Sequence, residues 1–97
     1  MAKGYWVSCY RAVHDEDKMT AYAKLAPGAI EAHGGKFVVR GVAAKAYEQG
    51  VAGRTVVVEF DSVEAATKAR DSTEYKAALD ALGNGVDRDF RVVEGVG

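Results

Sequence analysis

The stretch Gly34-Gly35-Lys36-Phe37-Val38-Val39-Arg40-Gly41 decides the fold, because it separates two parts of the chain that have similar patterns. The paired glycines end a helical segment, residues 36–40 favour a strand, and the Arg-Gly pair bends the chain again. A strand and a helix are expected before this stretch. A strand, a helix and a last strand are expected after it.

Upstream, residues 5–11 are rich in aromatic and β-favouring residues and predict the first strand. Asp15 is a suitable N-cap for the following helix, and acidic residues occupy its first turn. Pro27 predicts a kink in this helix, and Gly34 is placed to end it in a left-handed conformation. The apolar residues that share one helical face are Met19, Tyr22, Ala23, Ala26 and Ile30.

Downstream, residues 36–40, 54–60 and 89–96 predict three more strands, with a bulge at Gly41 and a strand extension over residues 43–48. Ser62 caps a second helical region, which breaks at residues 71–73 and restarts with Ser72 or Thr73 as its cap. The order strand, helix, strand, strand, helix, strand is that of the split βαβ motif. We therefore expect an α+β fold, a single ferredoxin-like domain over residues 1–97 with a four-stranded antiparallel sheet and its helices on one face.

Alternation along the strands predicts which residues face the helices. The apolar set assigned to the helix side is Val7, Cys9, Phe37, Val39, Val56, Val58, Phe60, Phe90 and Val92. The mixed set left on the open side is Trp6, Ser8, Tyr10, Lys36, Val38, Arg40, Thr55, Val57, Glu59, Arg91 and Val93. Because such an apolar surface usually has a partner, the sequence predicts a homodimer that pairs through the open face of the sheet.

The composition argues against several classes of function. A net charge of −1 provides no basic excess for phosphates, so nucleic acid is not an expected partner. No segment approaches the ~20 apolar residues of a membrane span, and the start lacks the apolar run of a signal peptide. The expected location is therefore the cytoplasm, with no membrane partner. The single cysteine, Cys9, is expected to be a small buried residue.

Several segments resemble, in order and at matching spacing, a family of small bacterial proteins described only as a domain of unknown function. They are residues 2–7, 33–41, 56–60, 71–75 and 92–96. The resemblance implies membership of the dimeric α/β-barrel superfamily, in which two ferredoxin-like sheets face each other. Antibiotic-biosynthesis monooxygenases share that architecture. The resemblance implies no reaction, because a shared fold does not determine function.

Four side chains are candidates for a small-molecule pocket: Tyr22, His33, Arg40 and Tyr75. Each has a structural alternative. The two tyrosines lie on apolar helical faces and can be core residues, His33 can interact with helix carbonyls, and Arg40 can pair with a carboxylate such as Glu59. In a functional role, Arg40 would hold a negative group on the ligand. No metal-ligand spacing or cofactor motif is present, so no metal and no cofactor are expected.

Two functions follow from these observations. The first is a small cytoplasmic homodimer that binds a small molecule or another protein without catalysis. The alternative is a cofactor-independent enzyme, monooxygenase- or isomerase-like, that acts on a small aromatic or carbonyl compound. The enclosure of a pocket around the candidate side chains distinguishes the two.

Overall fold

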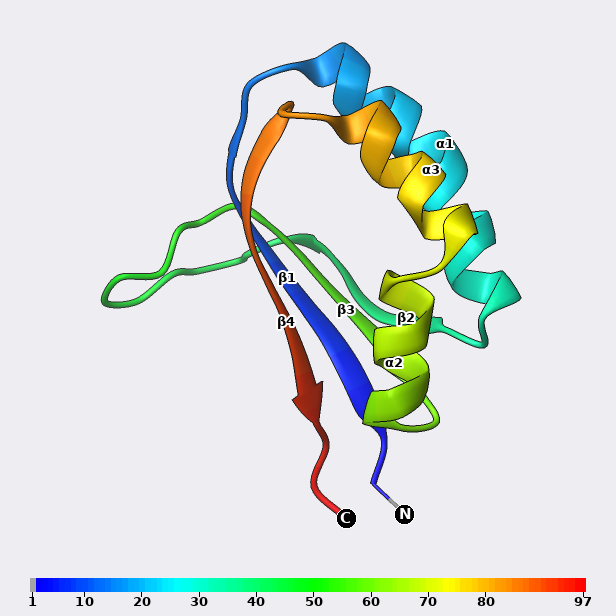
Figure 1. The fold of residues 1–97 in the computed structure, drawn as a ribbon. Coiled ribbons are helices and arrows are strands. Elements are labelled where there is room, and N and C mark those ends of the chain that lie inside the picture. Colours follow the sequence, from blue (N-terminus) through cyan, green and yellow to red (C-terminus); the bar gives the residue numbers. More distant parts are fainter. Residues whose placement is uncertain (1) are drawn as a thin grey trace.

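A computed structural model describes residues 2–97 as a twisted antiparallel sheet with all its helices on one face (Figure 1). The elements are β1 (Gly4–Val13), α1 (Glu16–Ala32), β2 (Lys36–Val42), β3 (Arg54–Phe60), α2 (Val63–Arg70), α3 (Thr73–Leu82) and β4 (Val86–Glu94). The strand order is β2-β3-β1-β4. This confirms the ferredoxin-like α+β fold, with the second helical region divided into α2 and α3.

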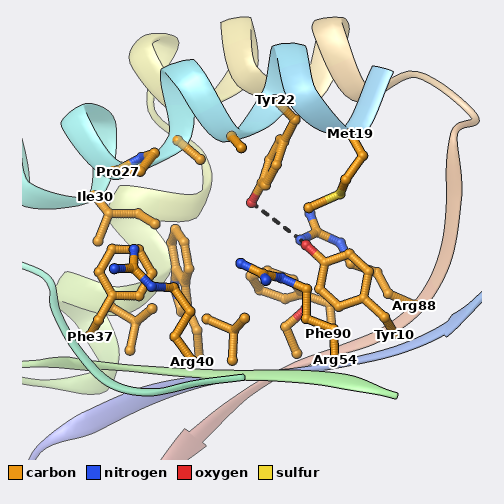
Figure 2. Close-up of a pocket in the computed structure, with 16 residues that line it drawn as sticks. Tyr10, Met19, Tyr22, Pro27, Ile30, Phe37, Arg40, Arg54, Arg88 and Phe90 are labelled. Carbon is orange, nitrogen blue, oxygen red and sulfur yellow. Dashed lines mark hydrogen bonds between the residues drawn. The ribbon is translucent and has the colours of Figure 1, made fainter. Parts of the chain in front are cut away.

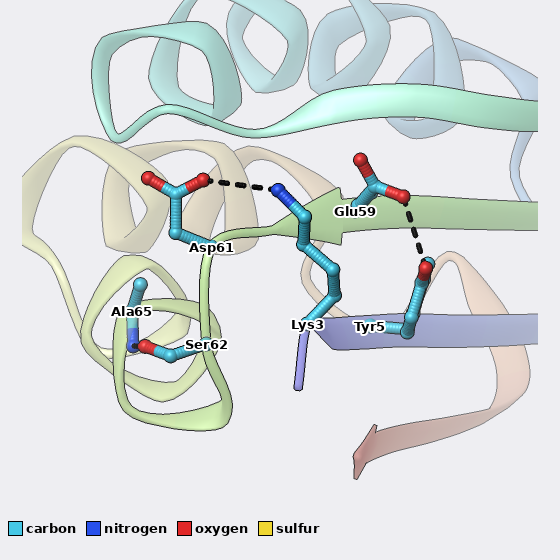
Figure 3. A network of polar contacts seen from close by, with 6 residues as sticks. All are labelled: Lys3, Tyr5, Glu59, Asp61, Ser62 and Ala65. Atoms are coloured by element: carbon cyan, nitrogen blue, oxygen red, sulfur yellow. Dashed lines mark hydrogen bonds and ion pairs between the residues drawn. The ribbon is translucent and has the colours of Figure 1, made fainter. Parts of the chain in front are cut away.

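Each helix begins at the cap residue expected from the sequence. The Asp15 side chain accepts a hydrogen bond from the Lys18 N–H, and the Ser72 hydroxyl accepts one from the Tyr75 N–H. Ser62 caps α2 in the same way, at 3.0 Å from the backbone nitrogen of Ala65 (Figure 3). These caps satisfy backbone donors that have no partner within the helix.

The first strand presents to the helices the residues that alternation had assigned to the open face. Trp6 pairs with Val58 on β3, and all three residues Trp6, Ser8 and Tyr10 are buried. The Trp6 indole N–H donates to the Ala66 carbonyl oxygen at 2.8 Å, and its ring lies 4.8 Å from that of Tyr75. The assignment was wrong because the larger aromatic residues of β1, and not the smaller Val7 and Cys9, fill the space beneath the helices. Cys9 is accordingly exposed.

The second strand contains a bulge that also differs from the prediction. The register shifts between Phe37 and Val39, while Gly41 pairs regularly with Thr55. Since an extra residue reverses the alternation, Val39 moves to the open face and Arg40 to the helix side. The chain then leaves the sheet, and residues 43–53 form a protruding loop in place of the predicted strand extension (Figure 1).

The open face is apolar at its centre and polar at its edge. The Tyr5 hydroxyl donates to a Glu59 carboxylate oxygen at 2.9 Å (Figure 3). Lys36 lies opposite Glu59 in the register. The apolar residues that the strand register places on this face are Val7, Val39, Val57 and Val93.

A cavity between helix and sheet

The candidate site is a cavity of about 120 Å³ between α1 and the helix-facing side of the sheet (Figure 2). Helix α1 packs against α3, whereas α2 is the helix that lies on β1, β3 and β4. The space beneath α1 is therefore enclosed mainly by side chains. The lining residues are Trp6, Ser8, Tyr10, Met19, Tyr22, Ala23, Ala26, Pro27, Ile30, Phe37, Arg40, Arg54, Val56, Val58, Arg88 and Phe90.

The strand register builds the floor of the cavity. Val56 of β3 pairs with Arg40 on one side and with Ser8 on the other, and Ser8 pairs in turn with Phe90. Ser8 thus lies in the middle of the floor. Its hydroxyl oxygen is buried and has no hydrogen-bond partner within residues 2–97. The other buried side-chain atom in this condition is the Nε of Arg54.

Helix α1 supplies the roof through the apolar face that the sequence predicts. Tyr22, Ala26 and Ile30 are buried, and Pro27 lines the cavity from within the helix. Ala26 leaves space between α1 and the sheet because its side chain is small. A larger side chain at this position would fill part of the cavity. The apolar face of α1 therefore forms one wall of the cavity and also belongs to the core.

Three arginines from three strands line this space: Arg40, Arg54 and Arg88. The Arg40 guanidinium lies 4.4 Å from the centre of the Phe37 ring, and that of Arg54 lies 5.9 Å from the Tyr10 ring. Cation–π contacts of this kind hold the side chains without cancelling their charge. In Figure 2, Arg54 directs its guanidinium towards the space below Tyr22.

Arg88 differs from the other two because tyrosine hydroxyls surround it. It donates to the hydroxyl oxygens of Tyr10 and Tyr22 at 3.2 Å each and to that of Tyr75 at 3.1 Å. Tyr22 and Tyr75 also share a hydrogen bond. Burial raises the pKa of the Tyr22 hydroxyl well above its usual range, and the adjacent Tyr75 raises this pKa further. Tyr22 is therefore a neutral hydroxyl at physiological pH.

The cavity carries positive charge without a protein counter-ion. None of the lining residues that the structure describes is an aspartate or a glutamate. The ion pairs found within residues 2–97 join other residues: Lys3 with Asp61, His14 with Asp87, His33 with Glu74, and Arg91 with Asp89. Arg54 and Arg88 are half-buried and Arg40 is exposed, and the described lining supplies no carboxylate to balance their charge.

The four residues predicted from the sequence do not all meet at this site. Tyr22 and Arg40 line the cavity, and Tyr75 lies immediately behind Tyr22 through their shared hydrogen bond. His33 lies elsewhere, with its Nε2 2.9 Å from a Glu74 carboxylate oxygen at the surface. This contact with His33 holds the pKa of Glu74 below its usual value.

Sequence reasoning missed Ser8, Arg54 and Arg88. Two of them had a detectable signal, because Arg54 continues the alternating set of Val56 and Val58, and Arg88 continues that of Phe90. An arginine at an inward position of a strand predicts a buried charge that needs a partner. Ser8 could not be found in this way, since its face depended on the orientation of β1.

Within residues 2–97, no helix has the length and apolar character needed to cross a bilayer. In that part of the chain, histidine, cysteine and acidic side chains also do not gather in groups of three that could hold a metal ion.

A family model described as "Domain of unknown function (DUF1330)" matches residues 3–96. No functionally curated protein matches the chain in sequence. Among solved structures, a protein of unknown function from Rhodopseudomonas palustris has a TM-score of 0.76 and 16% identity. The alignment covers 99% of this chain and 84% of that one.

Two other structures have related folds. The cofactor-independent oxygenase SnoaB from Streptomyces nogalater has a TM-score of 0.65 and 14% identity, covering 100% of this chain and 96% of SnoaB. A dimeric ferredoxin-like protein of unknown function from Thermobifida fusca has a TM-score of 0.59 and 20% identity, covering 95% and 90%. The predicted fold relationship to antibiotic-biosynthesis monooxygenases is confirmed, and these identities establish the fold alone.

Proposed function

The chain belongs to the DUF1330 family, and we propose that it is a small-molecule binding protein whose site is the cavity beneath α1. The observation that carries this proposal is the mixture of an apolar wall with buried polar atoms that have no partner within residues 2–97, on Ser8 and Arg54. Natural cores leave few such atoms unsatisfied. A ligand that offers both apolar surface and a hydrogen-bonding group complements such a wall.

The size of the cavity limits the ligand. A volume of 120 Å³ is small compared with the sites of drug-sized molecules. An apolar cavity of roughly 150 Å³ is known to bind benzene, so this cavity has room for about one small ring or a chain of similar size. The expected ligand is therefore a compound with a single ring or a short chain.

The single tryptophan provides a direct assay, because Trp6 lines the cavity. Small anionic, neutral and cationic compounds are titrated while Trp6 emission is recorded, and ligand-observed NMR confirms each binder. Ala23→Phe places a ring at the cavity wall and is expected to abolish binding. Ala77→Phe adds the same ring at an exposed position of α3 outside the lining and is the control. Binding that is unchanged in Ala23→Phe, or the absence of any binder, would overturn the proposal.

A cofactor-independent enzyme is the second candidate. It is supported by the position of Tyr22 and Arg40 in one cavity, and by the fold shared with an oxygenase that uses no cofactor. No carboxylate, imidazole or thiol is found among the described lining residues, so proton abstraction would have to use another group. Binding is therefore the function that the side chains support better. Product formation from a bound compound in air would establish catalysis.

We also propose that two copies of the chain pair through the open face of the sheet. Val39 and Val93 are 46% and 44% exposed there, and Val7 and Val57 lie between them. Helices cover only the opposite face (Figure 1). A protein of related fold from Thermobifida fusca is dimeric, which supports a dimer here.

A further inference from the structure

We infer that the ligand of the cavity is a carboxylate with a small apolar body, held by Arg54 together with Arg40. This inference rests on the proposed binding function and specifies its ligand class. Both arginines line the cavity, and within residues 2–97 neither has a carboxylate partner.

Arg54 is the principal anchor. Its Nε is fully buried and lacks an acceptor within the described residues, although an Arg Nε–H is an obligatory donor. Its partner across the ring contact is Tyr10, which offers a π face and not a lone pair to the guanidinium. A carboxylate in the cavity can accept parallel N–H bonds from such a guanidinium fork.

Arg40 and Arg88 have different parts in this arrangement. Arg40 is exposed and stacks on Phe37, so it can add its charge near the mouth of the cavity. Arg88 already donates hydrogen bonds to three tyrosine hydroxyls, and these contacts hold its guanidinium in place. We therefore assign recognition of the anion to Arg54 and Arg40, and positioning of the tyrosine wall to Arg88.

The rest of the lining defines the body of the ligand. Beyond the arginines, the described walls are predominantly aliphatic and aromatic, with Ile30, Phe37, Val58 and Phe90 among them. Ser8 is a polar residue of this lining without a partner among the described residues, and its hydroxyl can donate to a second oxygen of the ligand. A bare inorganic anion would leave this apolar wall unfilled. An amphipathic monocarboxylate, such as an aromatic or short-chain acid, uses both regions.

The test compares acids with their uncharged isosteres. Benzoate, phenylacetate and hexanoate are titrated against benzamide, phenylacetamide and hexanamide by calorimetry at neutral pH. We expect each acid to bind at least about tenfold more tightly than its amide, because hydrogen bonds to charged groups are worth more than neutral ones. Arg54→Met should remove most of this preference. Lys24→Met removes the same charge from an exposed position of α1 outside the lining and should preserve it.

The outcomes separate this inference from the proposed function. Amides that bind as tightly as the acids, and are excluded by Ala23→Phe, would overturn the carboxylate and leave the binding site intact. A preference that survives in Arg54→Met would also overturn the assignment. Binding by none of the six probes would contradict the inference, and the wider screen by Trp6 emission then decides the binding function by itself. If Arg54→Met fails to fold, Arg40→Met at an exposed position tests the second arginine, and a preference for the acids that is unchanged in this variant would overturn the inference.

Discussion

At the scale of single residues, Arg88 has the greatest structural importance. Arg88 lies on β4, and its guanidinium donates hydrogen bonds to tyrosines of β1, α1 and α3, which joins these elements in one network. Such a network is stable only while every member is satisfied, because a buried polar group without a partner is costly. The network therefore fixes the position of α1 over the sheet and keeps the cavity open.

Removal of this guanidinium should be much more harmful than removal of one hydroxyl. Arg88→Met leaves three tyrosine hydroxyls without their donor, and we expect a loss of about 3–5 kcal/mol in the free energy of unfolding. Tyr75→Phe removes one hydroxyl and should cost about 1–2 kcal/mol. Urea denaturation of both variants measures the difference. Equal losses would show that Arg88 is not the centre of the network.

The buried Tyr22 predicts a loss of stability at alkaline pH. Its pKa in the folded protein is above that of the unfolded chain, which is about 10, because burial disfavours the tyrosinate. The folded state therefore retains a proton that the unfolded state releases. The stabilisation is complete below pH ~10 and is lost as the pH rises towards the folded pKa, at ~1.4 kcal/mol per pH unit for one group.

Denaturation at several pH values between about 9 and 12 tests this linkage. We expect a shallower decline of stability in Tyr22→Phe than in the wild type. Tyr47→Phe is the control, because Tyr47 is 74% exposed in the protruding loop. The same slope in all three proteins would contradict a raised pKa for Tyr22.

At the scale of elements, helix ends, strand order and the faces of β3 and β4 could be predicted, whereas the faces of β1 and of the second half of β2 could not. The caps at Asp15, Ser62 and Ser72 are local, since each bonds to a backbone group three residues away. The face of a strand depends on partners distant in sequence. A single bulge between Phe37 and Val39 moves the Arg40 side chain to the helix side of the sheet, whereas the sequence predicted a bulge at Gly41.

The same limit explains the partial prediction of the site. Tyr22 was found because helical spacing reports which side is buried, and it does line the cavity. Arg40 was chosen for its chemistry and lines the cavity only because of the bulge. His33 was chosen for its titration range, but its position at the end of α1 brings it to Glu74.

The glycine pair between α1 and β2 makes a prediction at this scale, because its members have different tasks. Gly34 has a φ of +79° with open space around it, a conformation that asparagine also tolerates. A Cβ on Gly35 would lie 2.5 Å from Ile30 and 2.8 Å from Phe60, both in the core. Gly34→Asn should therefore cost less than about 1 kcal/mol, and Gly35→Asn about 1–3 kcal/mol through overpacking. Thermal unfolding ranks the variants, and the reverse order would contradict these roles.

At the scale of the whole molecule, the corrected strand faces change the composition of the proposed dimer interface. Trp6 and Tyr10 leave it for the core, while Val39 and the exposed Cys9 enter it. The face becomes less aromatic but remains apolar at its centre, where Val57 pairs with Val7 on one side and with Val39 on the other. Two such sheets stacked at the usual spacing of ~10 Å would exclude water from these valines.

The last prediction concerns this pairing. If the open faces meet, Val57→Glu places an unpaired charge at the centre of an interface of about 1,600 Å² and should produce monomers. Leu25→Glu is the control, since Leu25 is 46% exposed on α1, the helix side of the sheet, and should leave the assembly intact.

Light scattering after size exclusion gives the masses, and the reaction of the Cys9 thiol with a disulfide reagent gives an independent measure. Cys9 lies on the same face and should react slowly in the wild type and rapidly in Val57→Glu. Because the two sheets would bury both groups together, a monomeric wild type, or a Cys9 thiol equally reactive in both proteins, would show that this face remains open to water.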